Sequence, residues 1–182
     1  MASPTKQAIM ASFLRLVAKK SPDKITVRDI VDDCGVNRNT FYYYFQDIYA
    51  VMEDLCDDLI SSLPEGEPLG VTVTHFYARV AAFSAERPAA ARSMALSLGY
   101  EGLERYLGKK LEGLMLSHFV HHDLPLPSTL QLRITRHAIL GLCLDVMRGG
   151  KTPAPNADEL GALLLGQNSP LPMLDGNRKD SV

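Results

Sequence analysis

The sequence predicts an all-α protein, with an N-terminal three-helix head that contains a helix-turn-helix and a C-terminal helical bundle. Three observations support this prediction. Apolar residues recur at helical spacing along most of the chain, Gly and Pro separate the periodic segments, and two short helical patterns near the N-terminus are joined by one Cys-Gly turn. With 182 residues, 46% of them hydrophobic and 22% charged, the chain can bury one substantial core.

The first element is a helix from about Thr5 to Lys20. Its apolar residues recur every three or four positions, which predicts one buried stripe. Ser21 and Pro22 end the helix. The stripe consists of Ile9, Phe13, Leu16 and Val17.

The second helix begins at Thr26, because Thr26 and Asp29 have the spacing of a capping box. Gly35 ends it, since the tight turn that follows needs a residue that tolerates positive φ. The face expected to be buried carries Val27, Ile30, Val31 and Cys34. The outward face carries Arg28, Asp32 and Asp33.

The third helix has Asn37 as its N-cap, with Val36 and Phe41 in hydrophobic-staple positions. Phe41 and Phe45 lie one turn apart and hold this helix against the second. The residues left facing outward are Arg38, Asn39, Thr40, Tyr42 and Tyr43.

These outward residues offer donors and acceptors that suit DNA. An Arg can donate two hydrogen bonds to a guanine, an Asn can form a pair of hydrogen bonds with an adenine, and hydroxyl groups can donate to phosphate oxygens. The alternative is that Tyr42, Tyr43 and Tyr44 are packing aromatics. For Tyr44, which shares a face with Phe41, packing and DNA contact stay equally open.

Charge is distributed unevenly along the chain. The residues before Asp47 hold seven basic and four acidic side chains and carry a net charge of +3, so the remainder carries −5 of the total of −2. A basic head on an acidic body is expected of a DNA-binding protein, because neutralising phosphates supplies much of the affinity. An uneven scatter of surface charge is the alternative.

The head resembles the DNA-binding domain of the TetR family of transcriptional regulators. The resemblance rests on the run G-V-N-R-N-T-F-Y-Y-Y-F, preceded by T-V-R-D-I-V and a basic N-terminal helix, and covers the first quarter to third of the chain. The matching positions are Thr26, Gly35, Val36, Thr40, Phe41, Tyr42, Tyr44 and Phe45. One position departs from the family, which often has a phosphate-binding lysine where this chain has Ile48.

The resemblance implies roles for polar residues of the head, and Asn37 is also included in the expected DNA-binding set. Phosphate contacts are expected from Thr26, Thr40, Tyr42 and Tyr44. Base readout is expected from Arg28, Arg38, Asn39 and Tyr43.

Breakers divide the rest of the chain into further helices. A connector helix is expected over 47–63, and Pro64 to Pro68 form the boundary that follows it. Ser128 and Gln131 make a second capping box. The further helices are expected at 71–85, 88–98, 101–122, 128–148 and 158–165.

Three regions follow from the helices and the resemblance together. Residues 1–46 are the expected helix-turn-helix DNA-binding domain, and 47–166 are the expected helical ligand-binding and dimerisation domain. The remaining residues, 167–182, are polar, contain Pro and Gly, and are expected to be a disordered tail.

The helix at 128–148 is apolar on two sides, so it needs a partner beyond its own core. A homodimer built from this helix and the last one supplies that partner, while complete burial within one chain is the alternative. One stripe holds Leu130, Ile134, Ala138, Gly141 and Leu142. The other holds Leu132, Ile139, Cys143, Leu144 and Met147, and the last helix contributes Leu160, Leu163 and Leu164.

The resemblance also implies that the body encloses a pocket for a small-molecule effector, whose identity the sequence does not give. Aromatic and Met side chains could line such a pocket or belong to the core. The candidates are Phe76, Phe83, Met94, Tyr100, Tyr106, Met115 and Phe119. The segment from Phe76 to Phe119 also resembles TetR relatives associated with dihydroxyacetone-kinase operons, some of which are activators.

No catalytic arrangement is recognisable, so an enzyme is not expected, nor is any cofactor. Gly149 to Thr152 end like a phosphate-binding loop, but Asp145 stands where its first glycine should be. A metal could be bound by His118, His121, His122 and Asp123. The alternative is that these imidazoles interact with the free carbonyl groups at the C-terminus of the helix. The scattered cysteines Cys34, Cys56 and Cys143 suggest small hydrophobes rather than disulfides.

Neither a signal peptide nor a membrane-spanning apolar run is apparent, so a cytoplasmic protein is expected. The sequence therefore predicts a dimeric transcriptional repressor that a small molecule releases from a palindromic operator. The alternative is a co-regulator of the same fold that acts by protein-protein interaction without binding DNA.

Overall fold

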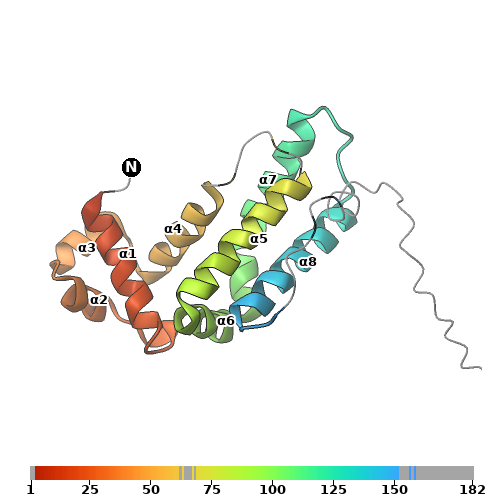
Figure 1. Cartoon of the computed structure of the whole chain (residues 1–182). Helices are drawn as coiled ribbons and strands as arrows, with labels where there is room; N and C mark the ends of the chain where they lie inside the picture. Colours follow the sequence, from red (N-terminus) through yellow and green to blue (C-terminus); the bar gives the residue numbers. More distant parts are fainter. Residues whose placement is uncertain are drawn as a thin grey trace, which may run out of the picture.

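The computed structural model describes residues 3–61, 63, 67, 69–151, 156 and 158 (Figure 1). Over this part of the chain every regular element is a helix, and none of these residues lies in a strand. The predicted all-α class is therefore confirmed. The helix expected at 158–165, apart from Asp158, and the expected tail at 167–182 lie outside the described residues, as does most of the boundary from Pro64 to Pro68.

Three helices make the head: α1 (Pro4–Val17), α2 (Val27–Cys34) and α3 (Arg38–Tyr44). They enclose Phe13, Ile30 and Phe41, whose side chains are completely buried. The predicted extension of α1 to Lys20 is wrong, because the amides of Lys19 and Lys20 both bond to the carbonyl of Leu16 and close the helix in a turn. A short 3₁₀ helix, η1 (Pro22–Lys24), then leads to α2.

The caps of α2 and α3 form as the sequence predicts. The Thr26 hydroxyl accepts from the amide of Asp29 at 3.2 Å, and the Asp29 carboxylate accepts from the amide of Thr26 at 2.7 Å, which completes the capping box. Gly35 adopts φ 73°, in the left-handed region. The Asn37 side chain caps α3 by accepting from the amide of Thr40 at 2.7 Å. These confirmed caps fix the turn between α2 and α3.

Helix α4 (Ile48–Ser61) leaves the head and joins it to the body. It begins one residue after the predicted start, because the Asp47 carboxylate serves as its cap and accepts from the amide of Ala50 at 2.9 Å. An ion pair between Lys6 and Asp54 also ties α1 to α4.

The body consists of α5 (Leu69–Glu86), α6 (Pro88–Leu103), the π-helical turn η2 (Glu104–Gly108), α7 (Lys109–His121) and α8 (Thr129–Met147). Helix α8 packs against α5 and α6, and α5 and α8 run side by side in Figure 1. The predicted capping box at the start of α8 is confirmed, with Gln131 and Ser128 bonded in both directions.

Gly99 interrupts α6 as expected, with φ 57° and ψ −160° inside an otherwise helical run. The chain does not form a separate helix over 101–122, however. It bends at Gly99, continues to Leu103, and passes through η2 before α7 begins. The helices expected at 88–98 and 101–122 are thus parts of one continuous helical segment that bends at Gly99. The backbone angles at Gly99 are accessible almost only to glycine.

The head lies against the body through α6, which both α1 and η1 contact. A hydrogen bond of 3.2 Å joins the hydroxyls of Ser21, just before η1, and Ser97 on α6. The buried apolar side chains form one continuous cluster that runs from α1 through α8. A movement of α6 would therefore displace the elements of the head that contact it, α1 and η1.

Replacing Gly99 tests whether its backbone conformation is required. Gly99→Ala should lower the free energy of unfolding by about 1–3 kcal/mol, because alanine is strained in this backbone conformation. The added Cβ would clash with no neighbouring atom, so the strain of the backbone is the expected cause. Gly113→Ala is the matched control: Gly113 lies exposed within α7, so alanine there should raise stability by about 0.5–1 kcal/mol. Urea denaturation measures both. Equal stabilisation by the two alanines would contradict a constrained Gly99.

Candidate nucleic-acid interface

Helix α3 presents a polar, aromatic face to solvent. Arg38 and Asn39 are exposed, Tyr43 is 81% exposed and Tyr42 is 45% exposed. The same helix buries Phe41 completely, so its two faces are sharply divided. A ring as exposed as that of Tyr43 contributes little to the stability of the fold, which favours a binding role for this face.

Arg38 and Tyr42 form a pair along α3 that the sequence analysis did not anticipate. The Arg38 guanidinium donates to the Tyr42 hydroxyl at 3.2 Å and lies 5.5 Å from the ring centroid. The Tyr42 ring in turn meets Phe41 edge-on, with centroids 5.6 Å apart. The buried Phe41 thereby orients Tyr42, and Tyr42 orients Arg38. Their spacing of four residues, the distance between neighbours on a helix face, is the signal that could have revealed the pair.

Tyr44 differs from the other two tyrosines. It is half-buried against the core, and its hydroxyl lies 2.9 Å from the hydroxyl of Ser3. This bond fastens the end of α3 to the start of α1. The contact favours the packing interpretation for Tyr44, and a phosphate contact from it stays a prediction.

The threonines predicted to contact phosphates also hold helix starts. The Thr26 hydroxyl donates to the Asp29 carboxylate at 2.6 Å, and the Thr40 hydroxyl donates to the Asn37 side chain at 3.0 Å. Each hydroxyl keeps a second lone pair but has its proton engaged. A phosphate, which only accepts, would need that proton, so these bonds would have to rearrange on binding.

Arg28 is exposed on α2 and pairs with Asp32 at 3.5 Å. The other ion pairs of the head join Lys6 to Asp54, Arg15 to Asp33 at 2.5 Å, and Lys20 to Asp29 at 2.7 Å. Several of the basic side chains that give the head its positive charge are therefore already paired within the protein. Ile48, the first residue of α4, is half-buried and offers no charge where the family often has a lysine.

The Lys20–Asp29 pair supports the start of α2. Hydrogen bonds from Lys20 and then from Thr26 hold the pKa of Asp29 well below its usual value. The carboxylate therefore stays ionised under all ordinary conditions and serves α2 as both cap and ion-pair partner.

A second candidate site lies in the body, where a cavity of about 220 Å³ opens among α4, α5, α6, η2 and α8. Three of the candidate ligand-binding residues, Phe83, Met94 and Tyr106, are among its lining residues, and their binding of a ligand stays a prediction. The remaining candidates are not among its lining residues: Phe76, Met115 and Phe119 are buried elsewhere in the core, and the hydroxyl of Tyr100 donates to Glu104 at 3.1 Å.

The three cysteines are free thiols. Cys56 and Cys143 line this cavity, and burial raises the pKa of each to about 12. Both are uncharged at neutral pH and act as small apolar groups, as predicted. Cys34 is half-buried in the head.

The histidines at the end of α7 lie close together, with ring centroids of His118 and His122 4.4 Å apart. Burial lowers the pKa of His118, and the neighbouring His122 lowers it further. Within the described part of the chain, no group of three or more His, Cys, Asp or Glu side chains is arranged to hold a metal ion. None of the described helices is both long and apolar enough to span a membrane.

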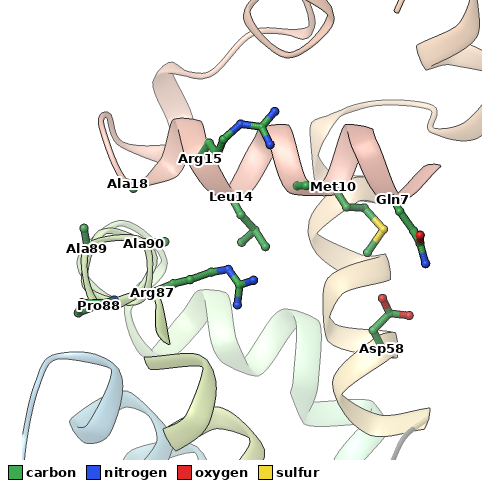
Figure 2. A pocket seen from close by; sticks show the side chains of 11 residues that line it. Gln7, Met10, Leu14, Arg15, Ala18, Asp58, Arg87, Pro88, Ala89 and Ala90 are labelled. Atoms are coloured by element: carbon green, nitrogen blue, oxygen red, sulfur yellow. The ribbon is translucent and has the colours of Figure 1, made fainter. Parts of the chain in front are cut away.

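A groove of about 550 Å³ separates the head from the body, and the sequence analysis did not foresee it (Figure 2). Its walls come from α1, α4 and the start of α6, and its polar lining includes Gln7, Arg15, Asp58 and Arg87. In Figure 2, Arg87 extends toward Leu14, Asp58 lies across the groove on α4, and the guanidinium of Arg15 points away.

Comparison with known proteins identifies the head. The family model described as "Bacterial regulatory proteins, tetR family" matches residues 9–55, which span most of α1 through the first half of α4. The head of this chain, though not its body, therefore matches the tetR family of bacterial regulatory proteins. The match contains the whole of the helix-turn-helix, including the polar face of α3.

One curated relative of this TetR-family head is the HTH-type transcriptional regulator EthR of Mycolicibacterium smegmatis. It is 39% identical over 59 residues, which amount to 32% of this chain and 27% of the relative. The similarity thus spans about a quarter of the relative's length and is confined to one region.

Solved structures extend the likeness to the body. A TetR-family regulator from Streptomyces coelicolor superposes with a TM-score of 0.56 at 23% identity, covering 87% of this chain and 78% of that one. The dihydroxyacetone kinase operon activator DhaS superposes with a TM-score of 0.61 at 18% identity, covering 90% and 96%. At these identities the likeness establishes the TetR-like fold of head and body together.

Asp29 gives the head a defined acid sensitivity. Because its pKa is lowered in the folded state, its stabilising contribution is present above about pH 4, near the unfolded value of 3.8, and is lost as the pH falls further. Asp29→Asn should therefore destabilise the protein at pH 7, and the difference in stability from the wild type should narrow as the pH falls below about 4. Urea denaturation from pH 7 to pH 3 measures this. Asp32→Asn, at an exposed position on the same helix, should have little effect; an equal loss in both variants would refute the role given to Asp29.

Proposed function

We propose that this chain is a dimeric transcriptional repressor that binds a palindromic operator and is released by a small-molecule ligand. The observation that supports this most directly is the division of α3, which buries Phe41 and presents Arg38, Asn39 and Tyr43 to solvent. The TetR-family match of the head supports it independently.

In this proposal α3 enters the major groove. Arg38, Asn39 and Tyr43 on α3, with Arg28 on α2, read base edges, while Tyr42 contacts a phosphate at the groove edge. The Arg38–Tyr42 bond holds the guanidinium in place before DNA arrives. A side chain that is already ordered loses less conformational entropy on binding.

The proposed dimer uses the outer face of α8. Leu130 is 64% exposed and Ile134 is 59% exposed, and Ala138 and Gly141 on the same stripe are exposed too. The opposite stripe of α8, which includes Leu132, Ile139 and Cys143, is buried. The alternative that both stripes are buried within one chain is therefore wrong. Leu160, Leu163 and Leu164, also assigned to this interface, lie outside the described residues.

A dimer matters for recognition because two α3 helices held about 34–36 Å apart can read two half-sites in successive major grooves. The proposed effector binds in the cavity of the body. That cavity contacts both α4, which leaves the head, and Leu14 on α1. A ligand there would touch the head as well as the body, which supports release by a change in the spacing of the two heads.

The DNA-binding residues can be tested by mobility shift with the region upstream of the protein's own gene. Arg38→Ala should weaken operator binding about ten-fold or more, and Tyr42→Phe should weaken it less, because it removes the hydroxyl but keeps the ring. Arg133→Ala, which removes an exposed arginine of α8, is the control and should not change binding. Unchanged retardation in both α3 variants would refute the assignments.

Failure of the wild-type protein to bind any DNA at low salt would instead favour the co-regulator that acts through protein contacts alone. DNA binding by phosphate neutralisation weakens as salt rises. Measuring wild-type binding over a range of salt concentrations therefore separates the two functions.

The dimer can be tested separately. Ile134→Glu places a charge at the centre of the exposed stripe of α8 and should convert the protein to a monomer in sedimentation experiments, with unchanged helical content by circular dichroism. Leu96→Glu is the matched control, because Leu96 is 70% exposed on α6, away from this stripe, and should leave the dimer intact. A dimeric Ile134→Glu protein would place the interface elsewhere.

A further inference from the structure

The inner cavity of the body and the groove between head and body share a boundary. Three side chains, Leu14, Asp58 and Arg87, line both spaces. They come from α1, α4 and the residue preceding α6, so the boundary lies where the head meets the body. A molecule that occupies the inner cavity from this side must pass or contact these three side chains.

The inner cavity is apolar except where charged side chains reach it. Its walls are formed by side chains such as Met52, Val80, Phe83 and Met147. The charged groups along it are Arg79, Arg87 and Asp58, two cations and one anion. Such a lining favours a ligand with an apolar body and an acidic group, because the cations along it outnumber the anion and a guanidinium binds a carboxylate through charge-assisted hydrogen bonds.

Arg87 is placed to receive that acidic group. Its guanidinium lies 6.0 Å from the ring centroid of Phe83, a residue of the cavity wall, and in Figure 2 it extends toward Leu14 at the boundary. One nitrogen bonds to Glu86 at 2.9 Å, but both partners of that pair are about half-exposed or more. Exposed pairs of this kind contribute little, and the other N–H groups of a guanidinium can bind a carboxylate.

We propose that the effector is a small amphipathic carboxylate, with its apolar body in the inner cavity and its carboxylate on Arg87 at the boundary with the groove. This inference rests on the proposed function, since it names the chemical class of the ligand that releases the operator. A volume of about 220 Å³ lies below the roughly 300–1,000 Å³ of common ligand pockets, which limits the ligand to a small molecule.

The position of Arg87 also explains how such a ligand would act on the head. Arg87 immediately precedes α6, and α6 contacts both α1 and η1. Leu14, on the other side of the boundary, belongs to α1. A carboxylate drawn to Arg87 therefore sits between the start of α6 and the first helix of the head, and its binding would change their contact.

The experiment compares four probes by isothermal titration calorimetry with the full-length protein. Octanoate combines an apolar chain with a carboxylate, octan-1-ol keeps the chain without the charge, octylamine reverses the charge, and acetate keeps the charge without the chain. Octanoate should bind at least ten-fold more tightly than octan-1-ol, and octylamine and acetate should bind more weakly still.

Variants assign the carboxylate to Arg87. Arg87→Gln should weaken octanoate binding at least ten-fold and bring it close to that of octan-1-ol, while Arg87→Lys should restore part of the difference. Arg133→Gln, which neutralises an exposed arginine of α8, is the matched control and should bind octanoate as the wild type does. Far-ultraviolet circular dichroism of each variant shows whether it is folded.

Equal or tighter binding of octan-1-ol or octylamine would overturn the carboxylate assignment, and so would octanoate binding that Arg87→Gln leaves unchanged. Absence of binding by all four probes would overturn it too. The operator mobility shift of the ligand-free protein is measured alongside. A protein that binds its operator but no carboxylate refutes only this inference, whereas one that binds no operator refutes the proposed function.

Discussion

Burial of Phe41 is the constraint on which the rest of the head depends. This side chain is completely enclosed, and Phe45 packs beside it with ring centroids 5.8 Å apart. Burying an aromatic ring of this size is among the larger stabilising contributions available to a small domain. Because α3 is only seven residues long, anchoring Phe41 fixes the rotation of the whole helix. The exposure of Arg38, Asn39 and Tyr43 is the consequence.

The same core continues from the head into the body. One cluster of buried apolar side chains includes Phe13 in α1, Val51 in α4, Ala91 in α6 and Leu140 in α8. Close-packed cores change between discrete arrangements rather than deforming smoothly. Head and body are therefore mechanically joined, and the groove with its charged boundary at Arg87 and Asp58 interrupts their contact. In the function we propose, an effector would act at this interruption.

Local patterns predicted most of the head and the boundaries of α8, because capping, turn formation and helical periodicity depend on residues within a few positions of one another. Thr26, Gly35, Asn37 and Ser128 all perform the predicted local role. Two errors concerned where a helix ends or changes its geometry. Helix α1 stops at Val17 rather than Lys20, and η2 interrupts a path whose periodicity suggested one long helix.

The sequence by itself determined the helix-turn-helix, its buried and outward faces, and the family that the head matches, since all three reside in one short run of residues. Only the tertiary structure decided which stripe of α8 is buried, which candidates line the inner cavity, and that Arg87 and Asp58 line both the cavity and the groove beside the head. The physical reason is that a periodic pattern says which residues share a face. What that face meets depends on helices far away in the chain.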